Sequence, residues 1–339
     1  MIITTPAPTI TKPIEQKPPE LFRTFLPRVP EVSALSWSSD GQFFVVTPVP
    51  SQTADSRSRD SQRVHVFDSK QESQTSIDDF DGCGRLFFHP HDLVFCSFMS
   101  GQLSITDITS KKTKTVAPLP LGPTSILCWT PEGERIVVCT QESSTLYLQS
   151  ISRRSGSIPA RTEISSIATS AFFSRPDELI VGFVDGSISQ YSYPALEKLY
   201  TFQGHTGTVS AFVFAPTGND SPPPFFISSG SDGCICVWEY GSFTVVRVIA
   251  KSSAAISSMS LSHNGEFIAY TSADNQTLEI AQTFTGASVY SQQTESVVNA
   301  VSWNPKSLKL IYGGKPVHSS KANVHLVVFN EERRLNLDG

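Results

Sequence analysis

Short apolar runs recur along the chain, and each ends in an aromatic or other large residue just before a turn. Pro, Gly, Asp or Asn occupies the turn, and a second apolar run follows it. The run Ile126–Trp129, for example, precedes a Pro-Glu-Gly turn at residues 131–133. The last residues of seven such runs are spaced 41 to 51 residues apart: Trp37, Phe88, Trp129, Phe173, Phe214, Leu261 and Trp303. This spacing indicates one structural unit repeated seven times.

A strand with period-2 alternation comes later in each unit, as at Leu103–Thr106 and Cys234–Trp238. Such alternation is typical of a half-buried β-strand. Tight Ser-Gly and Asp-Gly turns precede several of these strands, at 100–101, 185–186 and 232–233, and they favour hairpins. Seven units over residues 30–330 average about 43 residues, which is the repeat length of a β-propeller blade. No part of this span reads as a long amphipathic helix, so the sequence predicts an all-β, seven-bladed propeller.

Two intervals are longer than the rest because each contains a polar or Pro-rich insert, at Ser51–Arg63 and at residues 218–224. Closing a ring requires a strand from one chain end to pair in the blade at the other end. We expect Leu21–Leu26 to close the ring as the outer strand of the last blade, beside Ala322–Phe329; the alternative is an extended arm docked elsewhere. The predicted organisation is a Pro-rich disordered tail at 1–20, a propeller at 21–330 and a C-terminal tail at 331–339.

Composition and charge narrow the functional classes. Charged residues make up 17% of the chain and the net charge is −5. A protein that binds nucleic acid on its own usually carries a basic patch and a high pI, so we expect any RNA contact to be indirect or weak. The basic groups Lys111–Lys114 and Arg153-Arg154 are interpreted as solvated loop faces rather than phosphate contacts. No apolar run has the length of a membrane span or the core of a signal peptide.

The sequence offers no catalytic, cofactor or metal motif. Gly-rich phosphate loops and His-Glu-x-x-His are absent, and we expect no cofactor and no small-molecule substrate. The acidic group Asp78, Asp79 and Asp81 lacks the spaced Gly and Glu of a calcium loop and is interpreted as a solvated turn. Zinc sites use Cys-x2-Cys pairs or spaced His, which the six cysteines do not form; we expect buried free thiols in a reducing compartment: Cys83, Cys96, Cys128, Cys139, Cys234 and Cys236.

One unit carries a fuller signature. It begins with Gly204-His205, turns at Ser231-Asp232-Gly233 and ends its third strand with Trp238-Glu239. It resembles the WD-repeat family, in which a His, a strand Ser, a turn Asp and a Trp form a hydrogen-bonded structural tetrad. The resemblance implies that tetrad at four positions here: His205, Ser228, Asp232 and Trp238. The alternative is a Ser-His-Asp catalytic triad, which we disfavour because no strained nucleophile turn is present.

A closer resemblance covers about residues 21–330. These segments, in this order, are similar to the WD-repeat subunit of the THO complex (THO subunit 3 family): Ser192-Tyr193-Pro194, Ser260–Ala269, Ser272-Ala273-Asp274, Ile280-Ala281 and Val301–Lys306. The resemblance implies a nuclear, non-enzymatic scaffold in the THO/TREX assembly, which couples transcription, mRNP assembly and mRNA export. It implies docking on a large helical scaffold subunit and other THO subunits, with a DEAD-box export helicase reached indirectly.

Two other classes stay open at this point. One is a different WD-repeat adaptor, such as a ubiquitin-ligase substrate receptor or a chromatin peptide reader. The other is a propeller enzyme, which would need perturbed acids or histidines grouped at the mouth of the central channel. The sequence does not show which propeller face binds a partner.

Overall fold

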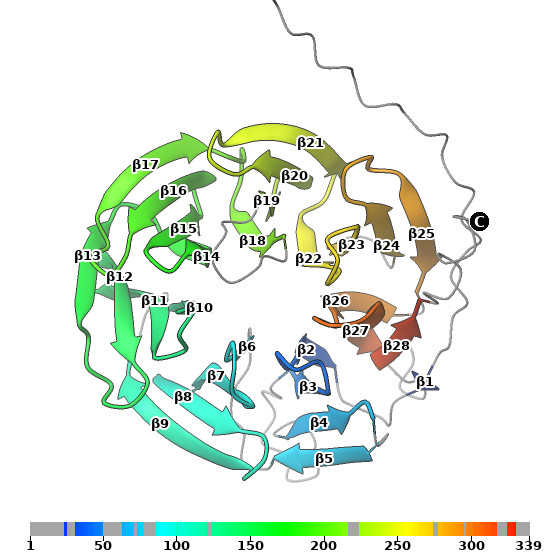
Figure 1. The fold of residues 1–339 in the computed structure, drawn as a ribbon, viewed down its shortest axis with the longest axis horizontal. Helices are drawn as coiled ribbons and strands as arrows, with labels where there is room; N and C mark the ends of the chain where they lie inside the picture. The colour runs from blue at the N-terminus through cyan, green and yellow to red at the C-terminus, as the bar shows by residue number, and fades with distance from the viewer. Residues whose placement is uncertain are drawn as a thin grey trace, which may run out of the picture.

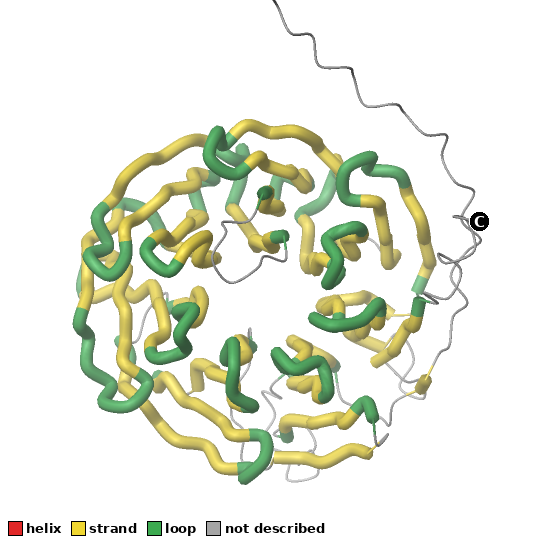
Figure 2. The backbone as a smooth tube through the Cα atoms, in the orientation of Figure 1, coloured by secondary structure: helices red, strands yellow, loops and turns green. Residues whose placement is uncertain are grey.

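The computed structural model forms a ring of seven antiparallel four-stranded sheets, arranged as blades around a central axis (Figure 1). It describes residues 24–25, 31–49, 63–70, 73–77, 86–99, 101–120, 124–215, 224–273, 277–294, 296–316 and 324–329. Throughout these residues the chain is built from strands and loops (Figure 2). No helix in this part of the chain is long and apolar enough to cross a membrane. The predicted seven-bladed, all-β fold is confirmed.

Each blade runs from an inner strand at the axis to an outer strand at the rim. Blade one contains β2 (Val32–Trp37), β3 (Phe43–Pro48), β4 (Val64–Asp68) and β5 (Ser73–Ile77). Blade two contains β6 (Phe87–Phe88), β7 (Val94–Met99), β8 (Gln102–Asp107) and β9 (Lys112–Pro118). Blade three contains β10 (Ser125–Trp129), β11 (Arg135–Glu142), β12 (Thr145–Ser152) and β13 (Ala160–Ile164). Blade four contains β14 (Ala168–Arg175), β15 (Glu178–Phe183), β16 (Ser187–Ser192) and β17 (Lys198–Gln203).

The remaining blades follow the same plan. Blade five contains β18 (Val209–Phe214), β19 (Phe225–Gly230), β20 (Cys234–Glu239) and β21 (Thr244–Lys251). Blade six contains β22 (Ile256–Leu261), β23 (Phe267–Ser272), β24 (Thr277–Gln282) and β25 (Ser288–Gln293). Blade seven contains β26 (Ser296–Trp303), β27 (Lys309–Pro316), β28 (Val324–Val328) and, from the other end of the chain, β1 (Thr24–Phe25).

The ring closes where the two ends of the chain meet. Strand β1 pairs antiparallel with β28, with Thr24 opposite Leu326 and Phe25 opposite His325. Two residues of the closing strand expected at 21–26, Thr24 and Phe25, therefore pair in the last blade, and the alternative of an arm docked elsewhere is wrong. The other residues of that expected strand lie outside the described residues. The predicted tails at 1–20 and 331–339 lie outside the described residues, as does most of the insert at 51–63.

The outer strands are the part of the fold that the sequence pattern did not locate in six of the blades. In blade one the outer strand reads Ser-Gln-Thr-Ser-Ile, and in blade three it reads Ala-Arg-Thr-Glu-Ile. Such strands are largely exposed on both faces, so they have little apolar–polar alternation for a pattern to detect. By contrast, the second and third strands are buried and stand out as apolar runs.

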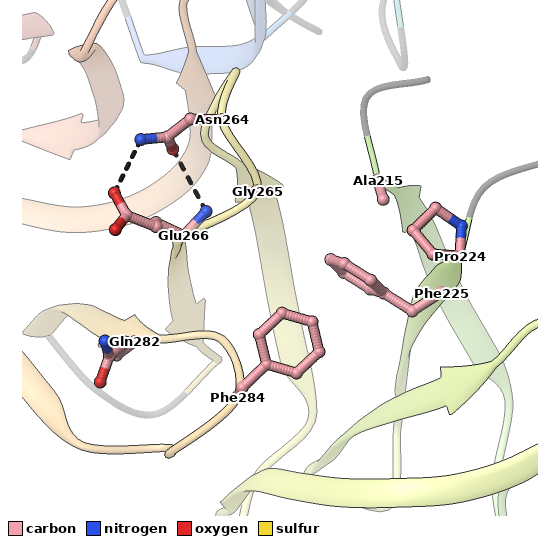
Figure 3. A pocket seen from close by; sticks show the side chains of 8 residues that line it. All are labelled: Ala215, Pro224, Phe225, Asn264, Gly265, Glu266, Gln282 and Phe284. Carbon is pink, nitrogen blue, oxygen red and sulfur yellow. Dashed lines mark hydrogen bonds between the residues drawn. The ribbon is translucent and has the colours of Figure 1, made fainter. Parts of the chain in front are cut away.

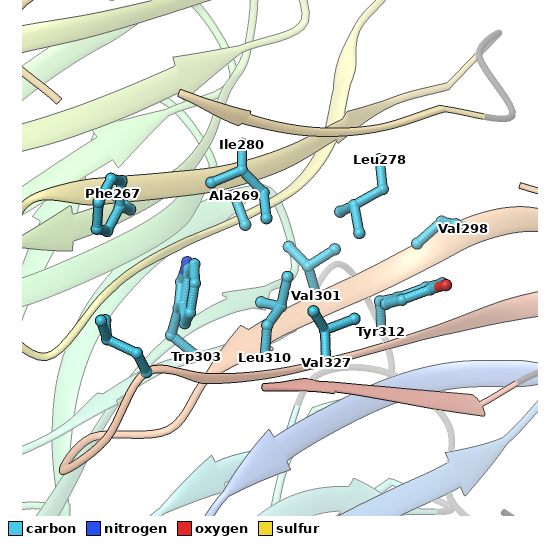
Figure 4. Close-up of a cluster of buried hydrophobic side chains, with 11 residues drawn as sticks. Phe267, Ala269, Leu278, Ile280, Val298, Val301, Trp303, Leu310, Tyr312 and Val327 are labelled. Atoms are coloured by element: carbon cyan, nitrogen blue, oxygen red, sulfur yellow. The ribbon is translucent and has the colours of Figure 1, made fainter. Parts of the chain in front are cut away.

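The core is divided into seven clusters of buried apolar side chains, one between each pair of neighbouring blades. Figure 4 shows the cluster between blades six and seven, where Phe267 and Leu278 face Trp303 and Tyr312. Each sheet therefore buries both of its faces, since it packs on a neighbour at either side. Sheets that are buried on both faces need many apolar and aromatic side chains and few charged ones, which agrees with the low charge and the abundant Phe of the sequence.

Antiparallel pairing gives the disc two different faces. The lower face carries the turns between first and second strands and between third and fourth strands, such as residues 130–134 and 193–197. The upper face carries the turns between second and third strands, such as 184–186 and 231–233, and the links between blades.

Two of the Trp residues that end inner strands form hydrogen bonds between neighbouring blades. Trp37 Nε1 donates to the carbonyl of Ser302 at 3.1 Å, and Trp129 Nε1 donates to that of Phe87 at 2.8 Å.

Candidate functional site

The structure brings the four residues expected to form the tetrad into one chain of hydrogen bonds in blade five. Asp232, in the upper-face turn, accepts from His205 Nδ1 at 3.0 Å. His205 Nε2 lies 2.6 Å from Ser228 Oγ on β19, and Trp238 Nε1 on β20 donates to the same hydroxyl at 2.8 Å. One assignment satisfies every group: Nδ1–H donates to the carboxylate, and the Ser228 hydroxyl donates to Nε2 while it accepts from the indole.

The Asp232 carboxylate is ionised and forms one end of this series of hydrogen bonds. Burial alone would raise the pKa of Asp232, but hydrogen bonds to the carboxylate from the N–H groups of Cys234 and Thr206 and from His205 outweigh it and hold the pKa below its usual value. These bonds also fix the turn, because Thr206 belongs to the link into the blade and Cys234 begins β20. This series of hydrogen bonds therefore connects the link into the blade with the second and third strands of the blade.

Ser228, His205 and Asp232 have the connectivity of a catalytic triad but lack its access. The Ser228 side chain is fully buried, and Trp238 beside it is 4% exposed. Its oxygen already accepts from the indole N–H. A nucleophile must reach a substrate carbon, which a hydroxyl buried beneath a tryptophan cannot do. The geometry supports the structural interpretation of these residues.

Blade three contains a substitute for half of this arrangement that the sequence pattern missed. In blade five, Ser228 pairs with the residue two positions before Trp238. In blade three, Thr140 pairs with the residue two positions before Gln149. Gln149 Nε2 donates to Thr140 Oγ1 at 2.7 Å, so an amide and a threonine replace the indole and the serine. The signal was present, since Gln149 occupies the place where a Trp would end the blade.

A second buried histidine joins blades two and three at the lower face. His89 follows β6, and its Nε2 lies 3.0 Å from the carbonyl oxygen of Gly133 in the next blade. Its Nδ1 accepts from the backbone N–H groups of Asp92 and His91, so the neutral ring carries its proton on Nε2 and donates it to Gly133. Arg153 Nη1 is ion-paired with Asp92 at 2.8 Å and also lies 2.8 Å from His89 Nε2, where its positive charge disfavours protonation of the ring. The Phe-His-Pro step at 88–90 is the sequence signal of this joint.

The joint predicts a pH dependence of stability. Burial holds the pKa of His89 below its usual value, and the Arg153 guanidinium acts in the same direction. As the pH falls below about 6.5, the unfolded chain takes up a proton on this residue before the folded chain does, so the free energy of unfolding falls. We expect His89→Gln to remove this contribution, at most about 1.4 kcal/mol for each pH unit, measured by urea unfolding on both sides of pH 6.5. The exposed His91→Gln is the control, and equal slopes for His89→Gln and wild type would contradict the assignment.

A similar joint closes the ring between blades seven and one. Asn304, which follows β26, donates from Nδ2 to the carbonyl of Gly41 at 2.8 Å. A Cβ on Gly41 would come within 2.7 Å of the Asn304 amide oxygen, and Gly41 has a φ of +70°. A residue at the end of an inner strand thus reaches the first turn of the next blade in both joints. Glycine is required in that turn both for its backbone conformation and for close approach.

A recess opens on the lower face between blades five and six, with a volume of about 240 Å³. Figure 3 shows its lining residues: Ala215, Pro224, Phe225, Asn264, Gly265, Glu266, Gln282 and Phe284. The rings of Phe225 and Phe284 meet edge to face, with centroids 4.8 Å apart. On the opposite wall, Asn264 Nδ2 donates to the Glu266 carboxylate at 2.8 Å. The recess therefore combines an aromatic wall with one acidic group, and we call it the blade 5–6 pocket.

Exposed apolar side chains gather in the same part of the ring. Nine large apolar side chains of the described residues are exposed, and Ile158 is the one that lies outside residues 184–284. The other eight belong to blades four to six: Val184, Leu199, Tyr200, Phe214, Val245, Val246, Val248 and Phe284. They are spread over an upper-face turn, the outer strands and the lower face, so Phe214 and Phe284 are the two that lie on the face of the pocket.

The other candidate groups are accounted for or lie outside the described part. The Arg153 and Arg154 side chains pair with Asp92 and Glu134. Burial raises the pKa of Cys236 to about 12, which leaves its thiol unreactive. The described ranges contain no group of three or more His, Cys, Asp or Glu that could hold a metal ion. The acidic group at 78–81 and residue 83 fall outside those ranges.

The ring defines the class of protein by its fold, a seven-bladed β-propeller, and blade five carries the hydrogen bonds of a WD repeat. The family model for the WD domain, G-beta repeat matches residues 196–239, which contain all four tetrad positions. The THO complex subunit 3 of Arabidopsis thaliana is 23% identical over 290 residues, which cover 84% of this chain and 86% of that protein. Among solved structures, the β-propeller domain of Cps50 (Swd1) from Myceliophteria thermophila superposes with a TM-score of 0.69 at 12% identity. That match covers 92% of this chain and 100% of that domain.

Proposed function

We propose that this chain is a non-enzymatic, nuclear protein-interaction subunit of a THO/TREX-type assembly, which couples transcription and mRNP assembly to mRNA export. The observation that carries the proposal is the similarity to a THO complex subunit 3, which extends over most of both chains and not over one repeat alone. The partners proposed are a large helical scaffold subunit and other THO subunits, with a DEAD-box helicase reached through them.

The physical properties of the ring support a docking role. The Ser228–His205–Asp232 group, which has the connectivity of a catalytic triad, is buried, and eight of the nine exposed large apolar side chains of the described residues belong to blades four to six. The chain carries a net charge of −5, which disfavours binding to the negatively charged phosphate backbone of RNA. In this proposal it meets RNA through its partners. Tight binding of RNA by the purified chain at physiological salt would contradict this part.

Affinity purification of the full chain from nuclear extract, followed by mass spectrometry, tests the proposal. We expect a large helical scaffold subunit and a DEAD-box helicase to be recovered with it. Recovery of cullin-type ligase subunits or of chromatin-modifying subunits in their place would show that the chain is a different WD-repeat adaptor. A tagged chain carrying Trp238→Ala, which we expect to destabilise blade five, is the control for partners that bind only a folded ring.

A further inference from the structure

The blade 5–6 pocket has the size and the lining of a site for one side chain. Small-molecule sites usually enclose about 300–1,000 Å³, whereas this pocket encloses about 240 Å³. Its volume therefore suits a single anchor residue better than a cofactor. Anchors of this kind, inserted in pockets at the centre of an interface, supply most of the binding energy between proteins.

The aromatic wall is held in place from outside the pocket. The backbone carbonyl of Phe284 accepts from Arg247 Nε on β21 at 3.0 Å, which ties this loop of blade six to the rim of blade five. The Phe284 ring is 54% exposed, while Phe225 behind it is 8% exposed. An apolar side chain that entered the pocket would cover the exposed ring and would pack on a fixed surface. Little reorganisation of the pocket would oppose binding.

The lower face of blades four to six carries more acidic than basic side chains, and Glu266 is the acidic residue of the pocket lining. In blades four to six, the described turns and strand ends of the lower face carry two cations, Arg175 and Lys198, and five carboxylates: Asp177, Glu178, Glu197, Glu239 and Glu266. Arg247 of β21 also lies beside the pocket, where its Nε donates to the Phe284 carbonyl. The Lys and Arg residues in the described lower-face turns belong to the other blades: Lys70, Lys111, Arg153, Arg154 and Lys306. This sector therefore favours a basic segment and disfavours RNA, because the phosphate backbone carries the same sign of charge.

We propose that the blade 5–6 pocket binds an apolar anchor side chain from a partner protein, in a segment that carries Lys or Arg beside the anchor. The anchor packs on the exposed ring of Phe284, beside Phe225, and the neighbouring cation meets the Glu266 carboxylate. This inference deepens the proposed function and rests on it in one respect, namely that the segment belongs to a partner subunit. Residues 216–223 of this chain and a second copy of the chain are the competing occupants.

The test is a titration of the full chain with short fluorescein-labelled peptides, measured by fluorescence anisotropy. One peptide has a Phe flanked by two Lys in a Gly/Ser background; its partners replace the Phe by Ala or both Lys by Glu. We expect the Lys-flanked Phe peptide to bind best, and Phe284→Ser to weaken it about tenfold or more. Glu266→Lys is expected to reverse the preference between the Lys and Glu peptides.

Matched controls separate the pocket from general surface effects. Tyr200→Ser removes an aromatic ring of similar exposure from the rim of blade four, and Glu132→Lys reverses an exposed acid in a lower-face turn of blade three. Both should bind the peptide as the wild type does. Equal losses in these controls, or equal binding of the three peptides by the wild type, would overturn the inference. Thermal unfolding of each variant checks that the ring is intact.

Photo-cross-linking identifies the occupant in the assembled complex. Benzoylphenylalanine in place of Phe284 should form a cross-link to a partner segment with an apolar residue next to Lys or Arg. A cross-link to residues 216–223, to a second copy of the chain or to RNA would overturn the inference, as would no cross-link at all. If the chain recovers THO-type partners but fails these tests, the proposed function stands and the inference about the pocket is wrong. If the pocket binds the peptide as expected but another assembly is recovered, the inference about the pocket stands and the proposed function is wrong.

Discussion

Replacing Trp238 by alanine is expected to lower the free energy of unfolding by about 3–5 kcal/mol, the range for deleting a large buried aromatic side chain. The ring is 4% exposed and packs in the cluster between blades four and five, with its centroid 5.2 Å from that of Phe202. Its removal leaves a cavity at the centre of that cluster and takes one donor from Ser228. Urea unfolding followed by circular dichroism measures the loss.

Trp238→Phe distinguishes the two contributions of the tryptophan. Phenylalanine keeps most of the buried ring but cannot donate to Ser228, so we expect a loss of about 1 kcal/mol, the usual net value of one hydrogen bond. The exposed Tyr200→Ala is the control and should change stability little. If Trp238→Phe lowered stability as much as Trp238→Ala, the hydrogen bond rather than the packed ring would be the main contribution.

Gly133→Ala is expected to lower the free energy of unfolding by about 2–4 kcal/mol, from left-handed backbone and overpacking together. Gly133 has a φ of +72°, and a Cβ there would lie 1.9 Å from His89 Nε2. The buried imidazole would have to leave its place between blades two and three. Its hydrogen bond to the Gly133 carbonyl would then be lost.

A matched glycine and a double variant isolate the contact. Gly241 also has a positive φ, +94°, but nothing lies within 4 Å of a Cβ added there. Gly241→Ala should therefore show the backbone contribution alone, about 1–2 kcal/mol. In the double variant His89→Ala with Gly133→Ala the clash is absent. The loss in free energy of unfolding should therefore be smaller than the sum of the losses of the two single variants. Strict additivity would show that the two residues do not meet in the folded protein.

The ring was predictable because its signal lies in buried strands. Seven apolar runs and their turns repeat at blade length, and the Asp-Gly turns of the upper face mark two of the hairpins. The tetrad positions were also readable, since His205, Ser228, Asp232 and Trp238 belong to one local unit of the chain. Local spacing carries such information because the four residues are held within one sheet and the link that precedes it.

The joints between blades and the pocket could not be read in the same way. His89 meets Gly133 across 44 residues, and Asn304 meets Gly41 across 263. Residues this far apart in the sequence can be recognised as contacts only when the relative positions of neighbouring blades are known. The blade 5–6 pocket likewise takes its walls from two blades, and neither wall has a motif. Contacts of this kind depend on packing geometry, which sequence periodicity does not encode.

The pairing of β1 with β28 also has a consequence for the time course of synthesis. Residues 24–25 leave the ribosome early, but their partners at 325–326 are made about 300 residues later, which takes roughly 15–60 s at about 5–20 residues per second. During that interval the earlier blades exist as an open arc with an uncovered sheet face at each end. Blade one in particular must wait for blade seven to bury Val32 and Leu35. The nascent arc is therefore the form of this protein most exposed to aggregation, and its last strands complete the ring in a single late step.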